Sequence, residues 1–223
     1  MVTPLVASAI VLSACGTSSA TATSPSATAG GSAGGPGSRG TGSNARSGPA
    51  AGGSAGTVAS VATGSFTIST SAGQKVTVDE ASSTTYENAT SSVSSSAIAT
   101  GENVLVLGTT NGTTIAAAQV VVQSSGATSA TSVAAGVIPF QQGAATTSKQ
   151  VGQIPANYSQ GSGTIVSGTT AYDATEAALA AYPGGIVDRV VQLSNGEFEV
   201  HYIGVNWPHH IFVTQQFNVV GAN

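Results

Sequence analysis

Two long stretches of this chain are rich in glycine, serine, alanine and threonine, the first almost entirely so. The first follows Cys15 and reads GTSSATATSPSATAGGSAGGPGSRGTGSNARSGPAAGGSAG, and the second is the segment 124–160. Such segments contain too little bulky apolar surface to offset the conformational entropy that folding removes. We therefore expect two small folded cores, one over residues 56–123 and one over residues 161–223, joined by disordered linkers.

The composition agrees with small cores. Only 6% of the 223 residues are charged and 5% are aromatic, and much of the apolar 40% is alanine. A single large core is excluded because alanine buries little area per residue. Within the second low-complexity stretch, Val137–Phe140 and Ile154–Tyr158 are apolar islands. We expect these islands to lie against a neighbouring domain.

The single cysteine follows a short apolar run and precedes the first low-complexity stretch. The sequence Leu12-Ser13-Ala14-Cys15 resembles the lipobox of bacterial lipoproteins. The resemblance implies a signal peptide over residues 1–14, diacylglycerol on the Cys15 thiol, and a disordered tether over residues 15–55. The protein would then lie on the outer face of the cytoplasmic membrane, held to the bilayer by its acyl chains. No lysine or arginine precedes the apolar run, so we expect translation to start upstream of Met1.

From Gly56 onward, apolar and polar residues alternate as they do in β-strands. Thr63-Gly64, Ala72-Gly73 and Asn111-Gly112 separate the apolar runs and are typical of hairpin turns. About five short strands in this length predict a small barrel, because a closed sheet leaves no long exposed edges. Phe66 lies in the alternating register and is expected in the core of the barrel.

The same stretch resembles an extracytoplasmic bacterial family catalogued as domain of unknown function 5666. The matching segments are GTVASV, SFTI, VTVD, GENVLVLG and AAQVVV, in that order. The resemblance implies an OB-like barrel, a fold that binds oligonucleotides or oligosaccharides in other proteins. Here Lys75 is the only basic residue of residues 56–123, which contain four acidic residues. We therefore expect no nucleic-acid partner.

The C-terminal segment predicts one helix followed by a sheet. Alanines and Leu179 favour a helix, Thr170 and Asp173 resemble its capping box, and Pro183-Gly184-Gly185 ends it. The strands that follow alternate so that Phe198 and its apolar neighbours face the helix. The expected fold class is α+β and mainly β, with one helix on an antiparallel sheet beside the OB-like barrel.

This segment, residues 161–223, resembles the PepSY domain of secreted bacterial proteins and protease propeptides. The resemblance rests on EAALAAYPGGIVDRVVQ, FEVHY and IFVTQQFNVVG, and the loop VNWPHH departs from the family pattern. It implies a peptide-binding or peptidase-regulating role and supplies no catalytic residues.

The net charge of −4 lies in the C-terminal segment, which contains five acidic residues and only Arg189 as a base. Alternation predicts that Glu197, Glu199 and His201 point away from the helix and form an acidic outer face. This face, together with Trp207 in the neighbouring loop, is the predicted partner-binding surface. The alternatives are a solvated face that keeps the domain soluble and a Trp207 that caps the core.

The histidines raise the question of a metal site. A turn through Gly204 and Pro208 would place His201 and His209 on one face, whereas alternation sends His210 to the other. His201 and His209 are thus the candidate ligands, although surface histidines of this kind usually bind no metal. We expect neither a metal nor another cofactor.

The sequence favours a lipid-anchored binding or regulatory protein over an enzyme. GGSAG occurs around Ser32 and Ser54 and matches G-x-S-x-G, but both copies lie in low-complexity sequence where the match arises by chance. The expected partner is an envelope protein, a peptidase or a peptide. The alternatives are a passive structural lipoprotein of the cell envelope and an envelope metal-binding protein.

Overall fold

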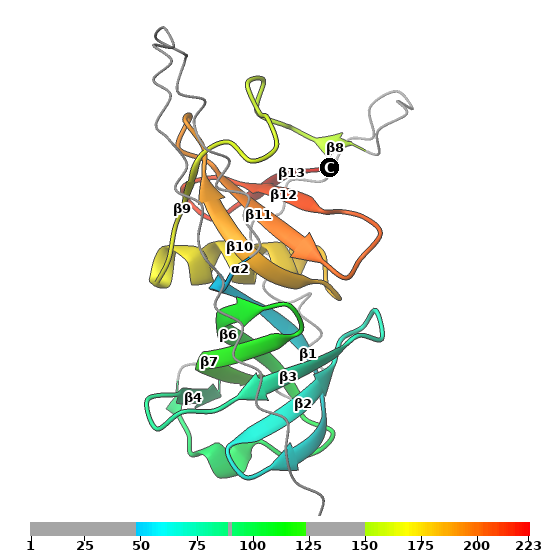
Figure 1. The fold of residues 1–223 in the computed structure, drawn as a ribbon, viewed down its shortest axis with the longest axis vertical. Coiled ribbons are helices and arrows are strands. Elements are labelled where there is room, and N and C mark those ends of the chain that lie inside the picture. The colour runs from blue at the N-terminus through cyan, green and yellow to red at the C-terminus, as the bar shows by residue number, and fades with distance from the viewer. Residues whose placement is uncertain (1–47, 89–90, 124–149) are drawn as a thin grey trace, which may run out of the picture. The chain divides into compact units, whose positions relative to one another are not determined.

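The computed structural model describes residues 48–88, 91–123 and 150–223, and within them the fold is mainly β with one α-helix (Figure 1). This confirms the predicted class. The proposed lipidation site Cys15, the signal peptide and the apolar island Val137–Phe140 lie outside the described residues.

Five strands in the first half of the described chain close into a barrel. Each strand hydrogen-bonds to the next in the order β1–β2–β3–β7–β6 and back to β1. Strands β3 and β7 run parallel, and the other neighbours are antiparallel. The strands are β1 (Ala50–Ala62), β2 (Ser65–Ser69), β3 (Lys75–Asp79), β6 (Asn103–Asn111) and β7 (Thr114–Gln123).

The barrel core follows from the alternation of the sequence. In β2 the side chains of Phe66 and Ile68 are buried, and in β3 those of Val76 and Val78 are buried, while their neighbours face outward. Between β3 and β6 the chain forms β4 (Thr85–Asn88), β5 (Ser91–Ser92) and the 3₁₀-helix η1 (Ser95–Ala97). Phe66 is therefore a core residue, as its register predicts.

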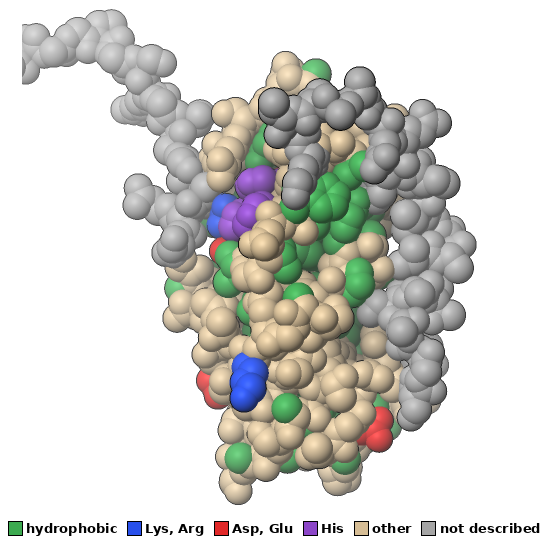
Figure 2. Space-filling model, turned by 90° about the vertical axis from the view of Figure 1, so that its right-hand side faces the viewer, with side chains coloured by type: hydrophobic (Ala, Val, Ile, Leu, Met, Phe, Trp, Pro, Cys, Tyr) green, Lys and Arg blue, Asp and Glu red, His purple; other side chains and the backbone are tan. Residues whose placement is uncertain are grey.

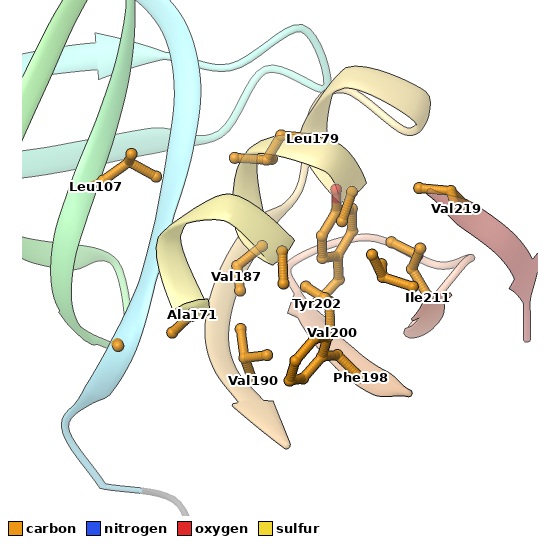
Figure 3. Packing of buried hydrophobic residues seen from close by; sticks show 14 of the residues in the cluster. Leu107, Ala171, Leu179, Val187, Val190, Phe198, Val200, Tyr202, Ile211 and Val219 are labelled. Carbon is orange, nitrogen blue, oxygen red and sulfur yellow. The ribbon is translucent and has the colours of Figure 1, made fainter. Parts of the chain in front are cut away.

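The C-terminal half packs the helix α2 (Thr169–Ala181) on one face of an antiparallel sheet. Figure 3 shows Ala171 and Leu179 of α2 close to Val187, Tyr202 and Ile211 of the sheet, which belong to the same buried cluster. The sheet consists of β10 (Ile186–Gln192), β11 (Phe198–Ile203), β12 (His210–Val213), β13 (Val219–Ala222) and β8 (Val151–Gly152), with β9 (Thr164–Ile165) on β10.

The predicted capping box at Thr170 is wrong. The N-cap residue of α2 is Gly168, which has a φ of 66° and no side chain to donate or accept a hydrogen bond. Thr170 lies inside the first turn, where helical backbone geometry prevents it from acting as the cap.

Strand β1 belongs to both halves of the structure. Gly53 and Ser54 pair with Val187 and Ile186 of β10, and the Ser54 hydroxyl donates a hydrogen bond of 3.0 Å to the Gly185 carbonyl. The tether predicted over residues 15–55 is therefore wrong in its last residues, because the strand begins at Ala50. Glycine and alanine are favoured here because only small residues allow backbones to approach this closely.

The end of the predicted linker 124–160 is also structured. Strand β8 pairs with β13, and Ile154 and Tyr158 pack against Leu193, Phe212 and Val220 on the sheet face opposite α2. This confirms that the island Ile154–Tyr158 lies against a neighbouring domain. We call residues 151–165 the covering segment, because they cover this outer face of the sheet.

Candidate functional site

The outer face of the C-terminal sheet carries Glu199 and His201, two of the residues predicted to form the partner-binding surface. Alternation in β11 directs Phe198, Val200 and Tyr202 to the core and Glu199 and His201 to the outer face, as predicted. The exposure predicted for Glu199 is wrong, since this side chain is only 1% exposed. The covering segment shields it from solvent.

A β-bulge in β10 adds two further charges to the same face. Val187 pairs with Tyr202 and Arg189 pairs with His201, so Asp188 is the extra residue. The bulge interrupts the alternation between the core residues Val187 and Val190. The Asp188 carboxylate thereby reaches both the Arg189 guanidinium, at 3.2 Å, and the His201 ring.

Two histidine–carboxylate pairs form the centre of this face. His201 Nδ1 lies 2.6 Å from Asp188 Oδ1, and His210 Nδ1 lies 2.5 Å from Glu199 Oε1. Each carboxylate accepts the hydrogen bond, so each imidazole carries a proton on Nδ1. The two rings are neighbours, with centroids 5.1 Å apart. We call Asp188, Arg189, Glu199, His201 and His210 the histidine cluster.

Tyr158 of the covering segment closes one side of the histidine cluster. Its hydroxyl donates a hydrogen bond of 3.2 Å to Glu199 Oε1, and its ring meets Phe212 edge-on with centroids 4.8 Å apart. Burial, followed by the nearby negative charge of Glu199, raises the pKa of the Tyr158 phenol well above its usual value. The phenol therefore remains a hydrogen-bond donor at every ordinary pH.

A groove of about 690 Å³ runs between the covering segment and the turn that joins β10 to β11. The lining combines residues that carry amide and hydroxyl groups with the apolar residues Pro155, Ala156 and Leu193. Its lining contains no charged side chain within the described residues. The lining residues are Pro155, Ala156, Asn157, Tyr158, Ser162, Gly163, Thr164, Gln192, Leu193, Ser194 and Asn195.

The remaining predicted site residues lie around this face without forming one surface. Glu197 is partly exposed at the β10–β11 turn, where its carboxylate accepts a hydrogen bond of 2.9 Å from Asn195. Trp207 packs edge-on against Tyr182 with centroids 5.8 Å apart and contacts the main core, as the capping alternative predicts. The expected continuous acidic face with Trp207 at its border is therefore not formed.

The pairing of the histidines also differs from the prediction. His209 is exposed, and its Nδ1 lies 3.4 Å from the Tyr202 carbonyl. His210 is the residue directly opposite His201 in the β11–β12 pairing. The turn is one residue longer than the alternation assumed, so His210 shares the face of His201. Among the described residues, no three histidine, cysteine or acidic side chains are grouped so as to bind a metal ion.

Among the described residues of the barrel, both aromatic side chains, Phe66 and Tyr86, pack in or against its core, so neither is free to stack on bases or sugars. Phe66 is buried, and the Tyr86 hydroxyl donates a hydrogen bond of 2.6 Å to Glu80. Burial and the Glu80 carboxylate raise the pKa of Tyr86 to about 12. The candidate site therefore lies on the C-terminal sheet.

Comparison with protein-family models, curated proteins and solved structures finds no match to this chain. None of the helices in the described ranges is long and apolar enough to cross a bilayer.

Sequence reasoning missed two members of the site, Asp188 and Tyr158, and placed a third, His210, on the opposite face of the sheet. One signal for Asp188 was present, because the pair Asp188-Arg189 interrupts the otherwise apolar run of IVDRVV. Two adjacent charges in a buried strand indicate a bulge that turns both outward. No comparable signal marks Tyr158, since its partner Glu199 is distant in sequence.

Proposed function

We propose that this protein is a lipid-anchored extracytoplasmic binding protein with no chemistry of its own. Its ligand is an extended peptide segment of an envelope protein, which lies in the groove between the covering segment and the β10–β11 turn. The groove, with its uncharged hydrogen-bonding lining, is the observation that carries the proposal.

The chemistry of the lining fits a peptide backbone. An extended peptide presents an amide donor and a carbonyl acceptor at every residue. Asn157, Gln192 and Asn195 carry both kinds of group, and the ring of Tyr158 supplies an apolar contact for a side chain. Glu197 at the rim favours an uncharged or basic peptide over an acidic one.

Two topological features support the finer fold assignments that belong to this proposal. The barrel order β1–β2–β3–β7–β6, with β3 parallel to β7, agrees with an OB-like barrel. A helix followed by an antiparallel sheet agrees with a PepSY-like module, in which a peptide-binding or peptidase-regulating role is known. The proposed ligand site lies in the second of these.

The groove is tested with fluorescently labelled short peptides of uncharged, basic and acidic composition, followed by fluorescence anisotropy. We expect saturable binding of the uncharged and basic peptides. Gln192→Ala should weaken it severalfold by removing an exposed lining amide. Gln216→Ala, at another exposed glutamine on the β12–β13 turn, should not. Absence of binding by every peptide, or equal affinity of both variants, would favour a passive structural role.

The anchor is tested separately. The proposed lipid on Cys15 predicts that Cys15→Ala moves the protein from the membrane fraction to the soluble envelope fraction, or leaves the signal uncleaved. Unchanged partitioning into detergent would contradict lipidation without bearing on the groove.

A further inference from the structure

We propose that His201 and His210 together bind one transition-metal ion, such as Cu²⁺ or Zn²⁺, through their Nε2 atoms. The inference rests on the histidine cluster and is independent of the peptide groove. Four observations support it: the strand register, the hydrogen bonds to Nδ1, the distance between the rings and the charge around them.

The register brings the two side chains as close as an antiparallel sheet allows. His201 and His210 are direct partners on β11 and β12. Both backbone groups of His210 bond to Asn223, at 3.0 and 2.8 Å, so they face away from β11. The two histidines are therefore a non-hydrogen-bonded pair, in which the Cα atoms lie only about 4.5 Å apart.

The carboxylates prepare the imidazoles as ligands. Metal-binding histidines in proteins commonly donate one ring N–H to a carboxylate, which fixes the tautomer and orients the other nitrogen toward the metal. Asp188 holds His201 in this way, and Glu199 holds His210. The histidine side chains are 15% and 10% exposed.

The separation of the rings matches a shared ion. With metal–nitrogen bonds of about 2.0–2.1 Å and N–metal–N angles of about 90–110°, two imidazole centroids lie about 4.5–5.2 Å apart. The observed separation is 5.1 Å. Figure 2 shows histidine side chains at the surface of one face of the protein, beside a basic side chain. The partial exposure of the His201 and His210 side chains lets an ion reach them from solvent.

The local charge also favours a cation. With neutral imidazoles, the cluster contains the carboxylates of Asp188 and Glu199 against the single guanidinium of Arg189. Since no third ligand is grouped with the histidines among the described residues, water would complete the coordination. Two nitrogen ligands favour Cu²⁺ over Zn²⁺ and exclude strong binding of Mg²⁺ or Ca²⁺.

The test is a titration of the full chain with CuCl₂ or ZnCl₂, followed by calorimetry and, for Cu²⁺, electron paramagnetic resonance. All variants carry Cys15→Ser, so that the thiol does not compete for the metal. We expect one ion per chain, with Cu²⁺ coupled to two nitrogens. His201→Gln and His210→Gln should each weaken binding at least about tenfold, and His209→Gln should leave it unchanged.

A further variant tests whether the carboxylate beside His201 orients this imidazole for metal binding or only stabilises the fold. Asp188→Asn keeps both imidazoles but removes the carboxylate that orients His201, and should weaken binding about tenfold. Circular dichroism first verifies that each variant is folded. Absence of saturable binding by both ions, or binding that survives both His201→Gln and His210→Gln, would overturn the proposal.

Discussion

At the scale of single residues, Glu199 is the carboxylate that connects His210 of the sheet with Tyr158 of the covering segment. It accepts hydrogen bonds from both His210 and Tyr158 and is 1% exposed. Glu199→Ala would leave both donors without their acceptor. We expect a loss of about 2–4 kcal/mol in the free energy of unfolding.

The measurement is urea denaturation of the wild type and two variants. Glu197→Ala, two residues away and partly exposed, is the matched control and should cost no more than about 0.5 kcal/mol. Equal losses for the two substitutions would show that the Glu199 pair does not stabilise the fold.

At the scale of elements, β1 can pair closely with β10 only because glycine at position 52 has no side chain. A Cβ atom at Gly52 would overlap the carbonyl oxygen of Val187. Gly52→Ala should therefore force β1 and β10 apart and cost about 1–3 kcal/mol of stability.

Gly48 provides the control, because a Cβ atom there meets nothing within 4 Å. Thermal unfolding of Gly52→Ala and Gly48→Ala should show a lower midpoint for the first variant only. A Gly52→Ala variant as stable as the wild type would contradict the close approach of the strands.

The elements also show where prediction from sequence succeeds and fails. Period-two alternation identified the core residues Phe66, Phe198 and Val200, because one buried face imposes it on a strand. It failed at the turn before His210, where one additional residue reverses the direction of every following side chain. It also gave no expectation for Asp188, the extra residue of the β10 bulge. The burial of Glu199 depends on a segment distant in sequence, and no local pattern encodes such a contact.

At the scale of the whole molecule, four tyrosines make stability sensitive to alkaline pH. Burial raises the pKa of Tyr86 to about 12, and raises those of Tyr158, Tyr182 and Tyr202 further. In the unfolded chain these phenols ionise near pH 10, whereas the folded chain keeps them protonated. The contribution of these phenols to the free energy of unfolding should therefore be fully present below pH 10 and decrease as the pH rises above it.

Urea midpoints between about pH 9 and pH 11.5, with phenolate absorbance recorded in parallel, measure this effect. We expect phenolate to appear together with unfolding. Ionisation of all tyrosines near pH 10 with the fold intact would show that these phenols are more accessible than their burial indicates.

The proposed function is also tested on the whole molecule, because residues of the covering segment and of the sheet line the groove together. The most direct measurement is amide hydrogen exchange of the intact protein with and without a saturating basic peptide. We predict slower exchange at residues 155–158, 162–164 and 192–195, which line the groove, and unchanged exchange at the barrel strands β2 and β3. Protection confined to the barrel, or no protection anywhere, would contradict the proposed function.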